Sequence, residues 1–251
     1  MDRTQLLRLL DEVRAGKLSP AEAAHELSAL PYAEVAQAVV IDHHRELRTG
    51  VPELVLGSNK TPEQIAAALR ELAKGGGALA TRVDTAKAAA VKALVPEVVV
   101  HETARVLVLG TPAPRPVCAP IAVVCAGTSD LAVAEEAALV AEFLGAPVTR
   151  ISDVGVAGLH RLLARLEDIR TTQVVIAVAG MEAALPSVLG GLIDRPLIAV
   201  PTSVGYGVSV DGLVALGALL AACAPGISVV NIDNGVGAAV AAVKIARLAA
   251  R

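Results

Sequence analysis

The sequence predicts an α/β fold in which a smaller N-terminal α+β domain precedes a C-terminal, doubly wound parallel sheet. Three observations favour it. The second half of the chain alternates apolar, Val- and Ile-rich segments with helical segments, which is typical of parallel strands covered by helices on both faces. The first half is more polar and mixed in pattern. Between them, residues 110–120 contain four prolines, a composition that favours a stiff, extended connection.

The first half contains helical and strand patterns in turn. Leu6, Leu7, Leu10 and Val13 follow helical spacing. Ser19 and Pro20 supply an N-cap and a first-turn proline for a helix through residues 21–30. The remaining patterns predict short strands at 36–42, 52–57 and 77–82 and helices at 61–76 and 84–95. Residues 97–110 fit either one strand or a hairpin.

The second half alternates regularly from residue 121 to the end. Apolar runs predict strands at 121–127, 146–154, 173–180, 196–202 and 227–233, with helices at 131–144, 156–167, 184–192, 211–222 and 235–250. We therefore expect an N-terminal domain at 1–112, a proline-rich linker at 113–118 and a catalytic domain at 119–251.

Composition excludes several classes of protein. With one Phe, two Tyr, no Trp and a net charge of −3, the chain lacks the aromatic platforms and the basic surface of nucleic-acid-binding proteins. Residues 212–232 carry no charge, but Pro225 and Gly226 interrupt them, so we expect a helix, a turn and a strand, and no membrane span. The charged start lacks the apolar run of a signal peptide, and three cysteines without a CxxC pair fit a reducing compartment. These features predict a cytoplasmic protein.

Small and polar residues follow every predicted strand of the second half. In parallel sheets, ligands bind beyond the carboxyl ends of the strands, and helix N-termini there offer free N–H groups to anions. One alternative is that such residues only cap helices, as any strand–helix loop requires. Five such loops on one edge favour a nucleotide- or phosphate-binding cleft, with the candidates Gly127, Thr128, Ser129, Asp130, Asp153, His160, Gly180, Ser203 and Asn234.

Further candidates have chemically reactive or charged side chains. Glu182 follows a fully apolar strand, where an apolar wall would raise its pKa for proton transfer, although a carboxylate at a helix start is equally common. Cys223 lies between a helix and a strand, and composition alone favours a buried apolar role for it. In the first half, Arg45, Arg48 and Lys60 are candidate anion contacts. The adjacent pair His43–His44 does not share a helix face, and no metal-ligand set is identified.

Taken together, these motifs resemble a known family. "GTSD" at 127–130, "DVGVAGLHRLL" at 153–163, "AGMEAALPSVLGGLIDRPLIAVPTSVGYG" at 179–207 and "VVNIDNGVGAA" at 229–239 are similar to LarB, the family that initiates nickel-pincer nucleotide cofactor synthesis for lactate racemase maturation. "DHHRELRTGVPELVLGSNKTPEQI" and "ALATR" extend the resemblance into the first half. The second half also resembles the PurE-type aminoimidazole ribonucleotide (AIR) carboxylases, which are octamers of a flavodoxin-like fold.

The resemblance implies a reaction. Members of the LarB family carboxylate the pyridinium ring of nicotinic acid adenine dinucleotide (NaAD) at C5 with CO₂. They also cleave its phosphoanhydride, releasing AMP and pyridinium-3,5-biscarboxylic acid mononucleotide. By resemblance, Cys223 is the nucleophile, Glu182 the acid–base group, and Ser129 and Asp130 belong to the nucleotide-binding turn. Mg²⁺ on the diphosphate is the expected cofactor.

The predicted topology adds a geometric expectation. A helix at 211–222 would carry Cys223 about 18 Å away from the strand ends that hold Glu182. We therefore expect a homo-oligomer, as in the octameric PurE type, with the active site shared between chains.

Two alternatives remain from the sequence. The first is a PurE-type mutase, although "GTSD" and "AGMEAALP" contain no histidine to move a proton. The second is a non-catalytic nucleotide-binding module.

Overall fold

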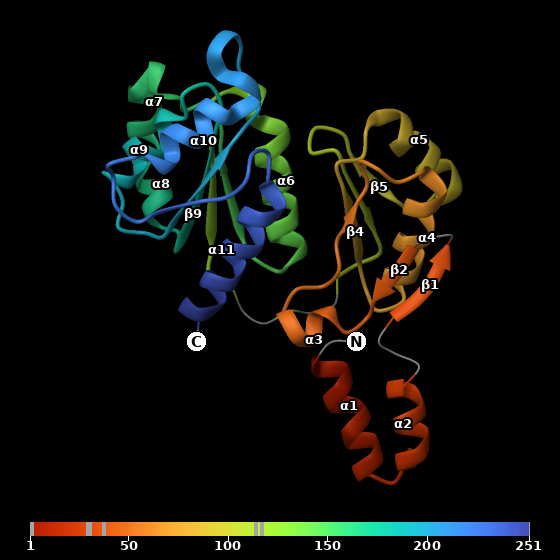
Figure 1. Ribbon diagram of the computed structural model, residues 1–251. Coiled ribbons are helices and arrows are strands. Elements are labelled where there is room, and N and C mark those ends of the chain that lie inside the picture. The colour runs from red at the N-terminus through yellow and green to blue at the C-terminus, as the bar shows by residue number, and fades with distance from the viewer. Residues whose placement is uncertain (1–2, 29–31, 37–38, 113–114, 116–117, 251) are drawn as a thin grey trace. The chain divides into compact units, whose positions relative to one another are not determined.

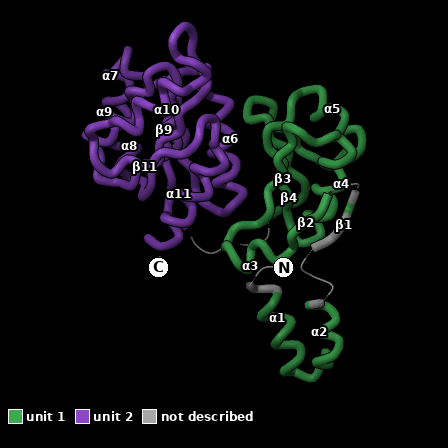
Figure 2. The backbone as a smooth tube through the Cα atoms, viewed as in Figure 1, with its two compact units in different colours: residues 1–113 green, residues 114–251 purple. Residues whose placement is uncertain are grey.

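The chain forms two compact units, residues 1–113 and 114–251 (Figure 2). The computed structural model describes residues 3–28, 32–36, 39–112, 115 and 118–250. The division between the units falls in the proline-rich stretch predicted as a linker, most of which (113–114 and 116–117) lies outside the described residues. Each unit has an apolar core of its own, so the two are described separately.

The N-terminal unit mixes helices with short strands (Figure 1). Its helices are α1 (Arg3–Arg14), α2 (Pro20–Ser28), α3 (Arg45–Thr49), α4 (Pro62–Ala73) and α5 (Thr85–Leu94). Its strands are β1 (Tyr32–Ala36), β2 (Val39–Asp42), β3 (Val55–Leu56), β4 (Ala78–Thr81), β5 (Val99–His101) and β6 (Val106–Leu109). The strand predicted at 36–42 corresponds to β2, whereas β1 was not predicted. Residues 37–38 of that predicted strand, like residues 29–30 of the second predicted helix, lie outside the described part.

Antiparallel pairing dominates this unit. β1 pairs with β2, and a four-stranded sheet has the order β3-β4-β6-β5, in which only β3 and β4 run parallel. β5 and β6 are antiparallel neighbours, so the segment 97–110 is a hairpin. The unit is therefore of the α+β type.

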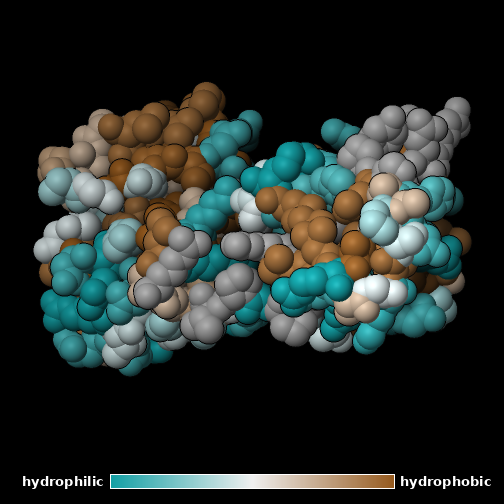
Figure 3. Space-filling model, turned by 90° about the horizontal axis from the view of Figure 1, so that it is seen from below, coloured by the Kyte–Doolittle hydropathy of each residue, from teal (hydrophilic) through white to brown (hydrophobic). Residues whose placement is uncertain are grey.

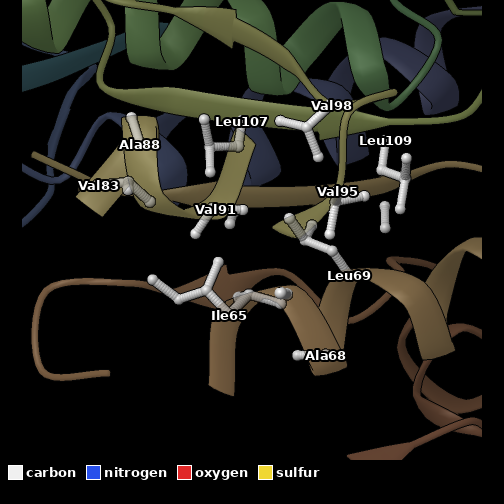
Figure 4. Close-up of a cluster of buried hydrophobic side chains, with 14 of the residues drawn as sticks. Ile65, Ala68, Leu69, Val83, Ala88, Val91, Val95, Val98, Leu107 and Leu109 are labelled. Atoms are coloured by element: carbon white, nitrogen blue, oxygen red, sulfur yellow. The ribbon is translucent and has the colours of Figure 1, made fainter. Parts of the chain in front are cut away.

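Helix α4 shows how sequence sets both the start of a helix and its buried face. The Thr61 side chain accepts the Gln64 N–H and the Gln64 side chain accepts the Thr61 N–H, a capping box that is followed by Pro62. Ile65 and Leu69, one turn apart, are fully buried and point into the cluster shown in Figure 4. Burying each such side chain contributes roughly 1.5–3 kcal/mol.

The C-terminal unit is a three-layer α/β domain. Its strands are β7 (Ile121–Cys125), β8 (Val148–Ile151), β9 (Val174–Ala179), β10 (Leu197–Pro201) and β11 (Ile227–Val229). Its α-helices are α6 (Leu131–Phe143), α7 (Leu159–Ala164), α8 (Leu166–Arg170), α9 (Ala184–Gly190), α10 (Leu213–Leu220) and α11 (Gly235–Ala249), and its 3₁₀ helices are η1 (Thr128–Asp130), η2 (Val156–Gly158) and η3 (Gly207–Gly212).

The five strands form one parallel sheet in the order β11-β10-β9-β7-β8. Every residue of β7, β9 and β10 is buried, as near-continuous apolar strands require when helices cover both faces. Helices α6 and α11 pack on one face (Figure 1). On the other face, Leu162, Leu189 and Leu219 of α7, α9 and α10 join alternate strand residues in one core cluster. The predicted doubly wound α/β class is confirmed.

Two predicted helices differ from the structure. The segment 156–167 is divided into η2, α7 and α8, because Arg165 leaves helical dihedral angles (φ −107°, ψ 4°). The helix expected at 211–222 begins only at Leu213, because Val210 and Asp211 have left-handed backbones and Gly212 has φ 90°. Within the described residues, none of the helices combines the length and the apolar character needed to cross a bilayer.

Candidate active site at the carboxyl edge of the C-terminal sheet

The strand order locates a crevice in the C-terminal unit. The chain runs outward from β7 to β8, then crosses to β9 on the other side of β7 and continues to β11. The order therefore reverses between β7 and β9. In doubly wound sheets, the crevice at the carboxyl ends of the two strands at this reversal is where ligands bind. Here those ends carry residues 126–130 and 180–183.

Asp130 joins the loop after β7 to the loop after β10. It is 4% exposed, and its Oδ1 accepts the Thr202 hydroxyl at 2.6 Å while its Oδ2 accepts the Gly127 N–H at 3.1 Å. Burial raises the pKa of the Asp130 carboxyl, and the Thr202 hydrogen bond opposes that rise. Both oxygens therefore have protein partners, so Asp130 holds the predicted nucleotide-binding turn in place.

Thr202 was not identified from the sequence, although it links three loops. It is fully buried; its N–H donates to the Ala179 carbonyl at 3.0 Å, and its hydroxyl oxygen accepts the Val204 N–H at 3.3 Å. A buried hydroxyl with one strong acceptor and one donor is fully satisfied. The signal for it was the Thr-Ser pair directly after an apolar strand, from which only Ser203 was selected.

The turn itself leaves its hydroxyl residues accessible. Thr128 and Ser129 are exposed in η1, immediately before the 13-residue helix α6. The first N–H groups of such a helix have no partner within the helix and favour an anion. Of the turn residues, these two are placed to contact a phosphate.

Glu182 lies in a tightly constrained loop after β9. A Cβ added to Gly180 would meet the Val204 carbonyl oxygen at 2.4 Å and the Thr202 hydroxyl at 2.6 Å, so this glycine is required by close loop packing. Met181 (φ 53°) and Ala183 (φ 49°), on either side of Glu182, have left-handed backbones. Glu182 is exposed, so its own chain does not supply the apolar wall expected from the sequence.

Strained backbone is concentrated at this edge of the sheet. Of the eight non-glycine residues with positive φ in the described chain, six follow strands of the C-terminal sheet: Asp153, Met181, Ala183, Val210, Asp211 and Asp233. Each such conformation costs about 1–3 kcal/mol and is found preferentially at functional sites. The strained residues therefore lie at the carboxyl ends of the strands, where the strand order also places the crevice.

Cys223 lies at the other edge of the sheet. Cys223 follows α10, and Ala224 is the next residue in the chain. A Cβ added to Gly190, at the end of α9, would lie 3.0 Å from the Cβ of Ala224 and 3.3 Å from Ile227, the first residue of β11. Residues 223–224 therefore lie by the amino ends of the strands, whereas Glu182 lies at the carboxyl ends. Within one chain, Cys223 and Glu182 therefore lie at opposite ends of the sheet.

The three cysteines differ in accessibility. Cys223 is exposed, whereas Cys118 and Cys125 are buried. Burial raises the pKa of the Cys118 thiol, and burial together with the nearby Asp130 carboxylate raises the pKa of the Cys125 thiol to about 12. Because the thiolate is the nucleophile, Cys223 is the thiol best placed to react.

Comparisons with known proteins identify the family. Residues 32–111 match the model of the LarB/PurE-like N-terminal domain, and residues 120–251 match that of AIR carboxylase. The chain belongs to the LarB family. An uncharacterized protein of Methanocaldococcus jannaschii is 36% identical over 254 residues, covering 96% of each chain. The N5-carboxyaminoimidazole ribonucleotide mutase of the same organism is 36% identical over 133 residues, 51% of this chain and 79% of the mutase. The LarB family and the AIR carboxylase domain support a carboxylase-type enzyme.

Three of the remaining candidates in this LarB-family chain have local partners. Asp153 forms an ion pair with Arg161, so Arg161, which sequence reasoning missed, neutralises it. Asn234 caps α11 by accepting the Gly237 N–H at 2.8 Å. Ser203 is exposed and its N–H donates to Asp233 at 2.8 Å. His160 is exposed beside Arg161.

The cations proposed in the N-terminal unit are largely paired there. Arg48 contacts Asp42 at 2.6 Å, and Arg45 lies 3.5 Å from Glu53. The Arg48 guanidinium lowers the pKa of the Asp42 carboxyl. The expectation that Arg45 and Arg48 serve as anion contacts is not supported, because carboxylates of their own unit already occupy them. Lys60 is half-buried in the turn before α4.

No ready-made metal site is present in the part of the chain that the structure describes, since it contains no group of three or more His, Cys, Asp or Glu side chains placed to hold an ion. The Mg²⁺ ion expected from the resemblance stays a prediction.

Proposed function

We propose that this protein carboxylates the pyridinium ring of NaAD at C5 and hydrolyses its phosphoanhydride, giving AMP and pyridinium-3,5-biscarboxylic acid mononucleotide. This would be the first step of nickel-pincer nucleotide synthesis. The observation that carries the proposal is an exposed thiol, Cys223, in an AIR carboxylase domain whose strand-reversal crevice presents Glu182. Its LarB-type N-terminal domain supports the same assignment.

A thiol solves the main chemical problem of this reaction. The pyridinium ring is electron-poor, so its C5 does not attack CO₂. The Cys223 thiolate adds to a ring carbon, and the ring becomes an enamine whose C5 is nucleophilic. C5 then forms a bond to the carbon of CO₂. Glu182 takes the C5 proton, the C–S bond breaks, and the ring regains its aromaticity while the thiolate is restored. Water then cleaves the phosphoanhydride.

The crevice residues would position the nucleotide. Thr128 and Ser129, at the start of α6, are the proposed phosphate contacts, and Asp130 and Thr202 hold their turn. We propose that Mg²⁺ binds together with the substrate diphosphate, since Mg²⁺ commonly binds through substrate phosphates and few carboxylates.

The separation of Cys223 from Glu182 leads us to propose a shared active site in a homo-oligomer, an octamer as in the PurE type. Exposed apolar residues near α10 support an interface: Tyr206, Val208, Leu213 and Leu220 are 80%, 83%, 57% and 69% exposed. One face of the C-terminal unit shows a broad hydrophobic area in Figure 3. Large exposed apolar patches mark protein–protein contacts.

Product analysis tests the proposed reaction. The protein is incubated with NaAD, bicarbonate and Mg²⁺, and the products are weighed by mass spectrometry. We expect AMP and a mononucleotide heavier by one carboxylate, with both absent for Cys223→Ala although that variant still binds the dinucleotide. Full turnover by Cys223→Ala would overturn the covalent mechanism.

The likeness to the N5-carboxyaminoimidazole ribonucleotide mutase gives the assay its second arm. Turnover of N5-carboxyaminoimidazole ribonucleotide without turnover of NaAD would assign the chain to the mutase reaction. Binding of NaAD without turnover of either substrate would assign it to a non-catalytic nucleotide-binding role.

A further inference from the structure

The N-terminal unit contains a cavity that the proposed reaction does not use. It measures about 150 Å³ and lies between α5 and the β5–β6 hairpin. Its floor is apolar, formed by Val83, Ala88, Ala89, Val100, Val106 and Leu107. Val83, Ala88 and Leu107 lie next to one another in the cluster of Figure 4. The floor is thus part of a packed core, so its shape is fixed.

The size of the cavity limits its occupant. Pockets for drug-sized ligands measure about 300–1,000 Å³, so a cavity of about 150 Å³ takes a much smaller molecule. Alanines at 88 and 89 leave the helix side of the cavity open, because their side chains are single methyl groups. An apolar space of about 150 Å³ is large enough for one aromatic ring.

The rim of the cavity is cationic. Lys92 and Arg105 line it, against one acid, Glu102. Lys92 Nζ donates one hydrogen bond to the Val98 carbonyl at 2.5 Å, which leaves two of its three donors. Among the described residues Arg105 forms no ion pair, and it is exposed. Two cations at the edge of an apolar floor favour a ligand with a ring and an anionic group.

The backbone of Arg105 supplies an independent argument. Arg105 has φ 54°, a left-handed conformation that glycine and asparagine adopt more easily than arginine. The Arg105 N–H donates to the Glu102 carbonyl at 3.1 Å, which closes the turn, and the Arg105 carbonyl accepts the Val83 N–H at 3.0 Å. Left-handed backbones of this kind cluster at functional sites, and Arg105 lines the cavity.

We propose that this cavity is a binding site for a small aromatic carboxylate. The ring lies against the accessible lining residues Ala89 and Val100, above the buried floor, and the carboxylate accepts hydrogen bonds from Arg105 and Lys92. The site is separate from the proposed reaction and is independent of it.

A titration of the full chain tests the site with three probes. Benzoate carries both an aromatic ring and a carboxylate charge. Benzamide has the ring without the charge, and acetate has the charge without the ring. Methyl NMR spectra of the Val- and Leu-labelled protein report where each probe binds. We expect benzoate to shift the methyl resonances of Val83, Val100 and Leu107. Benzamide and acetate should bind at least about tenfold more weakly, because charge-assisted hydrogen bonds and ring burial both contribute to binding. Equal binding of benzamide, or benzoate shifts confined to other residues, would overturn the proposal.

Two matched pairs of variants locate the binding. Ala89→Leu fills the cavity from α5, whereas Ala86→Leu adds the same side chain to an exposed position of the same helix outside the cavity. Arg105→Gln removes the charge, whereas Arg82→Gln changes the other left-handed arginine of this unit, which does not line the cavity.

We expect Ala89→Leu and Arg105→Gln to weaken benzoate binding at least about tenfold and both controls to leave it unchanged. Turnover of NaAD is measured in parallel, so that loss of binding is distinguished from failure of the proposed function. If Arg105→Gln does not fold, Ala89→Leu decides, since leucine and alanine are both strong helix formers. Retained benzoate binding in Ala89→Leu would refute the site.

Discussion

At the scale of single residues, Thr202 and Asp130 show how a buried polar pair organises the site. The carboxyl of Asp130 is almost fully buried, which raises its pKa, and the Thr202 hydroxyl 2.6 Å away stabilises its charged form. Because its pKa is higher in the folded than in the unfolded protein, the folded state binds the proton more tightly. As pH rises through the folded pKa, Asp130 ionises and the free energy of unfolding falls. Thr202 limits that loss.

Thr202→Val should therefore destabilise the protein more at neutral than at acidic pH. Loss of the hydroxyl leaves a buried carboxylate oxygen unpaired, which costs about 1–3 kcal/mol. The cost falls as pH decreases through the folded pKa of Asp130, where the carboxyl becomes protonated. Urea unfolding at a series of pH values from neutral to acidic measures it.

Two further variants control the measurement. Thr202→Ser keeps the hydroxyl and should retain most of the stability. In an Asp130→Asn background, which has no titrating group at this position, the effect of Thr202→Val should not depend on pH. A pH-independent loss in the wild-type background would contradict the assigned role.

At the scale of elements, the turn between α10 and β11 decides which thiol can react. α10 has 8 residues, about 12 Å at 1.5 Å per residue, and it carries the chain from the carboxyl edge toward the amino edge, where Cys223 is exposed. Cys125 lies at the end of the interior strand β7, and its Sγ–H donates to the Gly127 carbonyl at 3.0 Å. One cysteine is accessible and the other two belong to the packed interior.

Alkylation should separate the three cysteines. We expect iodoacetamide to modify Cys223 in the native protein and to reach Cys118 and Cys125 only after unfolding, because their thiols are buried and the pKa of Cys125 is about 12. Peptide mass spectrometry identifies the modified residue, and Cys223→Ala should show no rapid modification. Rapid native alkylation of Cys125 would contradict the packing described here.

At the scale of the whole molecule, the central question is how two distant residues serve one reaction. Within one chain, Glu182 and Cys223 lie at opposite edges of the sheet. A shared site therefore needs a second copy, for which the exposed apolar residues of η3 and α10 provide surface.

Mixing two inactive variants tests this arrangement. Cys223→Ala and Glu182→Gln chains are each expected to lack NaAD carboxylation. When the two are unfolded together and refolded into mixed oligomers, some sites combine an intact Cys223 from one chain with an intact Glu182 from another. We expect activity to return in part, up to about a quarter of wild type if each site draws on two randomly assorted chains. Activity that stays absent in verified mixed oligomers would exclude a shared site.

The sequence determined the elements and the class of fold. Continuous Val- and Ile-rich runs predicted β7, β9 and β10, and the pattern at 61–76 predicted α4, because secondary structure depends on interactions between near neighbours in the chain. The polar strand ends and the family resemblance also identified the loops of the crevice. The helix expected at 211–222 was wrong at its start, since left-handed residues at 210–212 reflect loop packing.

Only the tertiary structure decided which side chains meet. Asp130 and Thr202 are 72 positions apart, and Asp153 is paired with Arg161 by the folding of one loop. Arg45 and Arg48, which appear available in the sequence, are held by Asp42 and Glu53. The reason is physical: local pattern sets secondary structure, whereas burial, hydrogen bonding and charge pairing depend on segments that only the fold brings together.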